Sequence, residues 1–383
     1  MAAAPLRVFF STGEPSGELL AADLLAAMRA RAPVEAEAIG DVRLEREGVR
    51  IVQRNRGWAS LGVFEAVKRL PRTLTAGLRV ALGLRRSAPD LVVLVDFGAF
   101  NLRLARILRT LGFAKPIVYY APPSAWLDSV KRARLVARTC DALTIFRHQA
   151  EFYRSLGLPI GYEGHPLVST IAPRAPRPAP PADGGLLALL PGSRAGEIER
   201  HTPRLLDALA RVRETRPNVQ AVIVAADDDV QRHVEHLLSF RSPLPARVAR
   251  DARAALRDAD AALIASGTAV LEAALIETPA LALYVLSEAQ AKIARRIALP
   301  PYATLPNLVL SEPLVPELLQ EAATPAALAE GALDLLANPA RQLDGYARVR
   351  AALGPPDSLQ RNADWVLAAA AESLGAEPGA ERL

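Results

Sequence analysis

The sequence predicts an α/β fold made of two doubly wound domains, each with a parallel sheet covered by helices. Short apolar runs alternate with helix-like stretches in both halves of the chain, which is the pattern of parallel strands joined by helical crossovers. A proline-dense segment separates the two halves. A length of 383 residues also suits two domains better than a single core.

Four apolar runs in the first half are interpreted as strands. They are LRVFFST (6–12), LVVLVDF (91–97), PIVYYAP (116–122) and DALTIF (141–146). The second run is almost continuous Val and Leu, as expected of a parallel strand that is buried on both faces. Helical spacing follows the first two strands, from about Leu19 to Arg31 and from Asn101 to Gly112.

The second half repeats the alternation after the proline-dense segment. Its apolar runs are GLLALLPGS, AVIVAA, AALIASG and ALALYV, and helical spacing starts again near Pro325 with Thr324 as a candidate N-cap. The expected organisation is an N-terminal domain at 1–170, a proline-rich linker at 171–185, a second domain at 186–345, C-terminal helices at 346–375 and a tail at 376–383.

Composition narrows the class of protein. The single Cys140 excludes a disulfide framework and a thiolate metal cluster. No run approaches the ~20 apolar residues that cross a bilayer, and no signal peptide is recognisable, so we expect a cytoplasmic protein. The net charge of +5 is nearly all arginine. It reflects either compositional bias or attraction to phosphates, nucleotides or an acidic membrane, while no motif indicates nucleic acid.

Two motifs in the first half place carboxylates after strands. GEPSGE (13–18) joins the first strand to a helix, a layout that brings backbone N–H groups to the carboxyl edge of a sheet. Asp96 ends the most apolar strand, where a carboxylate costs free energy unless it is paired or faces a cleft, and where it suits a general base. The alternatives are a plain turn capped by Ser16 and an Asp96 that caps the helix near Asn101.

Two motifs in the second half resemble phosphate-binding turns. LPGSR (190–194), with Glu197 one turn later, offers helix N-terminal amides, a hydroxyl and a guanidinium. SGTAVLE (266–272) offers Ser266, Gly267 and Thr268 for a diphosphate and Glu272 for ribose hydroxyls. Neither motif is a Walker A loop. Simple strand-to-helix turns would have similar sequences.

The sequence favours no metal site. Asp227, Asp228 and Asp229 fit a solvated loop, and the five histidines are scattered without ligand spacing. His165 is expected to be a structural turn residue near the interdomain cleft. The stretch 61–86 mixes apolar residues, such as Phe64, with Lys68, Arg69 and Arg72. It fits either a membrane-surface helix or a core-facing helix with a solvated basic face.

Several blocks of sequence together resemble the lipid-A-disaccharide synthase family of GT-B glycosyltransferases. They are GEPSGE, VDFGAFNLR, PSAW (123–126), EFYRSLGLPIGYEGHPLV, LLPGSRAGEI, ASGTAVLEAAL, LPNLVLSEPLVPELLQE and RNAD (361–364). The resemblance implies two Rossmann-like domains facing a cleft, with C-terminal helices packing back toward the N-terminal domain. It also implies metal-independent, inverting transfer of 2,3-diacylglucosamine from its UDP form to 2,3-diacylglucosamine 1-phosphate, which forms a β-1,6 bond.

The resemblance also implies roles for individual residues. Asp96 would be the general base, with Glu14 as the alternative base or the acceptor-orienting group. The donor UDP would contact Ser193, Arg194, Glu197, Ser266, Gly267, Thr268, Glu272 and Asn307. The residues expected to face the acceptor or the membrane are Gly13, Ser16, Phe64, Lys68, Arg69, Arg72, Asn101, Ser124 and Trp126.

The implied partners are the UDP-sugar and an acylated glucosamine 1-phosphate, with no cofactor. The protein would be a monomer or homodimer, held peripherally at the inner face of a bacterial cytoplasmic membrane. Departures from the family pattern include AIGDVRL (38–44), Ala99, Asp128 and Ser129. The alternatives are a diverged paralogue with another acceptor, a UDP-sugar 2-epimerase-like enzyme, or a catalytically silent protein that binds sugar nucleotide or lipid.

Overall fold

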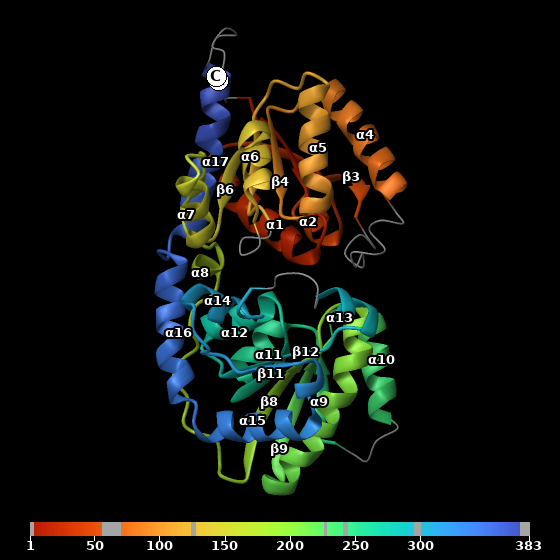
Figure 1. The fold of residues 1–383 in the computed structure, drawn as a ribbon, viewed down its shortest axis with the longest axis vertical. Helices are drawn as coiled ribbons and strands as arrows, with labels where there is room; N and C mark the ends of the chain where they lie inside the picture. Colours follow the sequence, from red (N-terminus) through yellow and green to blue (C-terminus); the bar gives the residue numbers. More distant parts are fainter. Residues whose placement is uncertain are drawn as a thin grey trace. The chain divides into compact units, whose positions relative to one another are not determined.

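The computed structural model describes residues 4–55, 70–123, 128–225, 228–239, 244–294 and 300–375. The chain forms two compact units, each with its own sheet (Figure 1). The first unit contains Met1–Thr170 and Leu353–Leu383, and the second contains Ile171–Ala352. Among the described residues, no helix is long and apolar enough to cross a membrane.

The first unit is built on a parallel sheet of seven strands in the order β3-β2-β1-β4-β5-β6-β7. The strands are β1 (Leu6–Ser11), β2 (Val34–Gly40), β3 (Arg50–Arg54), β4 (Leu91–Val95), β5 (Ile117–Tyr120), β6 (Asp141–Thr144) and β7 (Gly161–Tyr162). The helices are α1 (Pro15–Arg29), α2 (Val42–Arg46), α4 (Leu70–Ser87), α5 (Gly98–Thr110), α6 (Val130–Thr139), α7 (Arg147–Ser155), α8 (Leu167–Thr170) and α17 (Ser358–Gly375). The strand order reverses between β1 and β4, which is the switch point of a doubly wound sheet.

The central strand β4 shows why the first unit folds this way. All five of its residues are buried. Val93 and Val95 join the core beneath α1 and α17, whereas Val92 and Leu94 join the core beneath α5 and α6. The prediction that this continuous apolar run forms a strand buried on both faces is therefore confirmed.

The C-terminal helix α17 belongs to the first unit and packs beside α1 (Figure 1). Its RNAD segment explains the attachment. The buried amide of Asn362 donates to the Tyr120 hydroxyl at 3.3 Å and to the Gly164 carbonyl at 3.3 Å. Arg31, two residues after the end of α1, forms an ion pair with Asp364. The expected return of the C-terminal helices to the N-terminal domain is therefore confirmed for α17.

The second unit has a parallel six-stranded sheet in the order β10-β9-β8-β11-β12-β13, with its switch point between β8 and β11. The strands are β8 (Gly184–Leu190), β9 (Asn218–Val224), β10 (Ala246–Ala249), β11 (Ala261–Ala265), β12 (Ala280–Tyr284) and β13 (Glu317–Leu319). The helices are α9 (Ala195–Thr215), α10 (Asp228–Ser239), α11 (Ala252–Asp258), α12 (Thr268–Ile276), α13 (Glu288–Ala294), α14 (Leu305–Leu310), the short 3₁₀ helix η1 (Gln320–Ala322), α15 (Pro325–Ala337) and α16 (Ala340–Leu353).

The proline-rich segment before β8 belongs to the second unit. The backbone N–H of Arg174 donates to the Ile276 carbonyl at 2.9 Å, so this segment is attached to the end of α12. Thr324 caps α15 by accepting a hydrogen bond from the Ala327 N–H at 3.1 Å, as the sequence predicted. Five strands were not predicted from the sequence, namely β2, β3, β7, β10 and β13.

Candidate active site

Each unit brings two of the sequence motifs to the switch point of its sheet. In the first unit, Gly13 and Glu14 follow β1 and Asp96 follows β4, and these strands are neighbours. In the second unit, the loop ending at Arg194 follows β8 and the turn at Gly267 follows β11, which are also neighbours. The carboxyl ends of parallel strands at a switch point form the usual ligand-binding crevice of such sheets.

The turn after β1 packs tightly against the end of β4. A Cβ atom at Gly13 would overlap the Phe97 ring, so only glycine fits there. One turn later, the Cβ position of Gly17 lies 3.9 Å from the Cβ of Asp96. The first turn of α1, which includes Ser16, therefore lies beside Asp96, and Glu14 occupies the N-cap position.

The backbone at Asp96 adopts a conformation that is unusual for residues other than glycine. Asp96 and Phe97 have φ angles of 47° and 48°, in the left-handed region, which costs free energy and is often found at functional sites. Hydrogen bonds hold this geometry. The Asp96 N–H donates to the Tyr120 carbonyl at 3.1 Å. The Asp96 carbonyl accepts from the Tyr119 hydroxyl at 3.1 Å and from the Asn101 amide at 2.9 Å.

The alternative that Asp96 caps the helix near Asn101 is wrong, because no side chain caps α5. Asn101 itself was expected to face the acceptor. Its side chain is fully buried. The amide also donates to the Ser11 carbonyl at 3.2 Å and the Val95 carbonyl at 3.0 Å, and its oxygen accepts from the Ser11 hydroxyl at 2.6 Å. Asn101 therefore ties the end of β1 to the end of β4, and it positions Asp96 through the backbone.

The Asp96 carboxyl has a strongly shifted pKa. Burial raises this pKa to about 6, and the negative charge of Glu14 adds to the increase. A general base is most effective when its pKa is near the operating pH. Asp96 is half-buried, so the carboxyl is removed from much of the solvent and can still meet a ligand.

In the second unit, Glu197 organises the loop after β8. Its side chain accepts hydrogen bonds from the N–H groups of Ser193 at 3.3 Å and Arg194 at 3.4 Å. It also accepts from the Arg194 guanidinium at 2.9 Å and the Tyr284 hydroxyl at 3.0 Å. Glu197 is buried, whereas the Arg194 side chain is 45% exposed. Glu197 was expected to contact the donor, and here it orients the exposed arginine instead.

His201 is a site residue that the sequence reading missed. It lies one turn after Glu197 on α9 and is fully buried. Its Nδ1 is 2.8 Å from the Pro191 carbonyl, which can only accept, and its Nε2 accepts from the Val285 N–H at 3.0 Å. Burial lowers the pKa of His201, which favours this neutral tautomer. The ring therefore links the loop after β8 to the loop after β12.

The N-terminus of α12 is the candidate anion site of the second unit. Gly267 is its N-cap, and no side chain caps the helix. The Cβ position of Gly267 faces open space, with no atom within 4 Å among the described residues. Free amides at a helix N-terminus favour anions. Thr268 begins the helix beside these amides, and Ser266 donates its hydroxyl to the Ala303 carbonyl at 2.6 Å.

Glu272 and Asn307 are held by other residues of the second unit. Glu272 accepts from the Arg253 guanidinium at 2.8 Å, and its side chain is 12% exposed. Asn307 is fully buried, so the expectation that it lines the donor side is corrected. Its amide donates to the Val315 carbonyl and to Glu317, both at 2.8 Å.

Glu317 is a second residue that the sequence reading missed. Its carboxylate also accepts from the Thr304 N–H at 2.9 Å, the Thr304 hydroxyl at 2.7 Å and the Ala303 N–H at 2.9 Å. It therefore fixes the segment 303–307 against Ser266. Asn307 and Glu317 position the wall of the α12 site.

Comparison with known proteins identifies the family. The family model for lipid-A-disaccharide synthetase matches residues 8–363. The chain is 36% identical to lipid-A-disaccharide synthase of Pseudomonas aeruginosa, covering 93% of this chain and 96% of that protein. It is 37% identical to the synthase of Azotobacter vinelandii, with 94% and 97% covered.

The chain belongs to the lipid-A-disaccharide synthetase family. It is a glycosyltransferase that forms the lipid A disaccharide. Solved structures agree on the fold. A putative UDP-N-acetylglucosamine 2-epimerase from Listeria monocytogenes has a TM-score of 0.65 at 14% identity, and each chain is fully covered. MurG from Acinetobacter baumannii has a TM-score of 0.56 at 15% identity, with 95% and 100% covered. The architecture is that of the GT-B class.

The departures from the family pattern at 38–44, Ala99, Asp128 and Ser129 lie in the first unit. Residues 38–40 end β2, and α2 begins at Val42. Asp41 forms an ion pair with Arg54 at 2.7 Å, and Asp128 accepts from the Gln149 amide at 3.1 Å. Both carboxylates therefore have structural partners.

Some residues that the sequence predicts for the site lie outside the part of the chain that the structure describes. Phe64, Lys68, Arg69, Ser124 and Trp126 lie outside the described residues, as does Asp227, and Arg72 is described only as part of the α4 backbone. Within the described ranges, no group of three or more His, Cys, Asp or Glu side chains could hold a metal.

Proposed function

We propose that this enzyme transfers 2,3-diacylglucosamine from UDP to the 6-hydroxyl of 2,3-diacylglucosamine 1-phosphate, with inversion at the anomeric carbon. The products are the β-1,6 disaccharide and UDP. Family membership supports the reaction. The observation that carries the assignment of residues is Asp96, a carboxyl with a raised pKa at the end of the central strand, braced by Asn101 and Tyr119.

Asp96 is the proposed general base. As the acceptor's 6-oxygen bonds to the anomeric carbon, the bond from that carbon to the UDP oxygen breaks and the hydroxyl proton passes to the Asp96 carboxylate. Glu14 raises the proton affinity of Asp96 by its charge. It stands at the N-cap of α1, where it can also orient the acceptor. Proton transfer then requires no cofactor.

The donor diphosphate is proposed to bind at the N-terminus of α12. The amides there have no side-chain cap, and Gly267 leaves open space beside them. Arg194 would add a positive charge opposite the leaving phosphate, stabilising the negative charge that develops as UDP departs. Ser193 and Thr268 offer further hydrogen bonds, and Glu272 is proposed to hold ribose. Metal ions are not needed in this arrangement.

Two structural neighbours support a UDP-sugar donor. They are the Staphylococcus aureus MnaA structure with UDP and the Neisseria meningitidis epimerase structure with UDP-GlcNAc. Their TM-scores are 0.60 and 0.61 at 13% and 11% identity. Because the fold is shared, the crevice at the strand ends has the same topological position in these proteins and in this chain. In this chain, the motif loops provide the groups that would bind the diphosphate.

Helix α4 is the proposed membrane contact at the inner face of the cytoplasmic membrane. Leu78 and Leu82, one turn apart, are 47% and 40% exposed, and exposed arginines at 79, 85 and 86 accompany them. Apolar side chains flanked by arginines suit an anionic membrane interface. Changing both leucines to serine should reduce co-flotation with phosphatidylglycerol vesicles, whereas Val130→Ser, at an equally exposed site on α6, should not.

The test of the reaction is incubation with UDP-2,3-diacylglucosamine and 2,3-diacylglucosamine 1-phosphate. We expect equal amounts of UDP and disaccharide by mass spectrometry, with the β-anomer identified by NMR. Omission of the acceptor should stop UDP release. UDP binding without disaccharide from these substrates would overturn the substrate assignment.

A further inference from the structure

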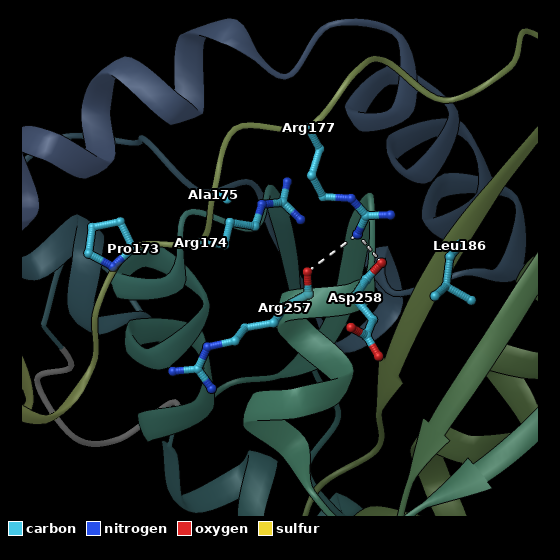
Figure 2. A pocket seen from close by; sticks show the side chains of 7 residues that line it. All are labelled: Pro173, Arg174, Ala175, Arg177, Leu186, Arg257 and Asp258. Atoms are coloured by element: carbon cyan, nitrogen blue, oxygen red, sulfur yellow. Dashed lines mark hydrogen bonds between the residues drawn. The ribbon is translucent and has the colours of Figure 1, made fainter.

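A hollow of about 620 Å³ opens at the amino-terminal edge of the second unit's sheet, and three arginines line it (Figure 2). Arg174 and Arg177 come from the proline-rich segment before β8, and Arg257 comes from the last turn of α11. The α12 site lies past the opposite ends of the strands. Because β8 has seven residues, about 20 Å separates the two ends. The hollow is therefore not part of the candidate active site.

The positive charges in this hollow are only partly balanced. Arg177 donates to the Arg257 carbonyl at 3.3 Å and to the Asp258 carbonyl, and it lies 3.7 Å from the Asp260 carboxylate. Arg174 donates to the Ala259 carbonyl and has no carboxylate partner within the described ranges. The Arg257 guanidinium has neither a hydrogen bond nor an ion pair among those residues.

The arginines also affect one another. Burial lowers the pKa of Arg174, and the like charge of Arg177 lowers it further. Figure 2 shows the guanidinium groups of Arg174 and Arg177 near each other, whereas the Arg257 side chain lines the same hollow but extends away from them. Each guanidinium has five N–H donors, and the carbonyl of Ala259 uses only one nitrogen of Arg174. Donors therefore remain for a ligand, and an anion would relieve the repulsion.

We propose that this hollow binds a phosphate group, either free phosphate or the phosphomonoester of a lipid headgroup. Arginine forks match phosphate oxygens in pairs. Among the described residues, Asp260 is the acidic group that pairs with these arginines, and it also accepts from the Leu186 N–H at 2.8 Å. Asp258 lines the hollow too, but its carboxylate lies 3.9 Å from Arg247. A doubly charged ligand fits the remaining two guanidiniums better than a carboxylate. This inference does not depend on the proposed transfer reaction.

The first experiment titrates the full-length protein with inorganic phosphate at constant ionic strength, by calorimetry. The key variant is Arg257→Gln, because this guanidinium has no structural partner and the fold should be unaffected. We expect saturable binding by wild type and binding about tenfold weaker in the variant. Arg211→Gln, at an exposed position on α9, is the matched charge control. Arg194→Gln tests whether phosphate instead occupies the active site.

The second experiment distinguishes the source of the phosphate. Wild type and Arg257→Gln are floated with vesicles containing phosphatidic acid or phosphatidylcholine alone. Loss of phosphate binding in the variant supports a soluble ligand, and loss of binding only to phosphatidic acid vesicles supports a lipid headgroup. The proposal is overturned if wild type binds neither probe, if Arg257→Gln binds both as wild type does, or if Arg194→Gln alone abolishes binding.

Discussion

The two units share a topology and differ in the charge that they place at its switch point. In the first unit the neighbouring strand ends carry Glu14 and Asp96, which are acidic. In the second they carry the uncapped amides of α12 and the guanidinium of Arg194, which attract anions. A sugar hydroxyl must lose a proton and a diphosphate must be stabilised as it leaves. In such folds the sheet topology determines where ligands bind, and a few loop residues determine which ligands bind there.

Removing the acidic group should have the largest effect. Asp96→Asn keeps the size of the side chain and removes the proton acceptor, so kcat should fall roughly 10²- to 10⁴-fold. UDP affinity should stay within about twofold, because the proposed donor site lies in the other unit. Asp90→Asn, at the opposite end of β4, is the matched control and should retain activity. Equal losses in both variants would argue for a structural effect.

Removing the basic group, Arg194, should impair UDP binding in the second unit. Arg194→Gln should weaken UDP binding about 10- to 100-fold, since a hydrogen bond to a charged group contributes about 1.5–3 kcal/mol. Calorimetry with UDP measures this directly. Asp96→Asn serves as the cross-control. If the two variants lost UDP affinity equally, the division of labour between the units would be wrong.

Substitution of His201 should affect binding of the UDP-sugar less than substitution of Arg194 does. His201→Ala removes the link between the loops at Pro191 and Val285, so the KM for the UDP-sugar should rise about tenfold, with a smaller change in kcat. His201→Gln keeps a donor and an acceptor and should recover part of the loss. A fall in thermal stability without a change in KM would leave His201 with only a structural role.

The pH profile should give the smallest effect and distinguish the two carboxylates. The raised pKa of Asp96, about 6, means that the base is protonated below this pH. Therefore kcat/KM should fall about tenfold per unit as pH decreases below about 6 and level off above it. Glu14→Gln removes a charge that raises the pKa of Asp96, so the acid limb should move to lower pH. Loss of activity at every pH would instead identify Glu14 as the base.

The sequence was informative where apolar runs and turn motifs coincide. The buried strands β1, β4, β8 and β11 were all predicted, and the four motif loops follow them. The missed strands lie toward the sheet edges, where polar residues interrupt the apolar pattern, and all of them except β2 have five residues or fewer. In β2, Glu35 and Glu37 alternate with buried Val34, Ala36 and Ala38, which is a strand pattern with small side chains.

The errors at the site have a different cause. His201 was missed because its contact to Val285 spans 84 positions, and no local motif predicts such a contact. Asn101 and Asn307 were expected to meet ligands because the family resemblance implies it, and both are buried. Buried amides are retained when every donor and acceptor is satisfied. Their role as braces is therefore visible only in three dimensions.

The return of α17 to the first unit has a consequence for biosynthesis. Leu359, Ala363 and Val366 complete the core under β1 and β4, yet the ribosome makes them after the entire second unit. Residues 171–352 are contiguous and can fold as they emerge. The N-terminal unit must wait with apolar surface uncovered, a state in which chaperones bind nascent chains. A truncation that removes α17 would thus damage the unit formed by residues 1–170.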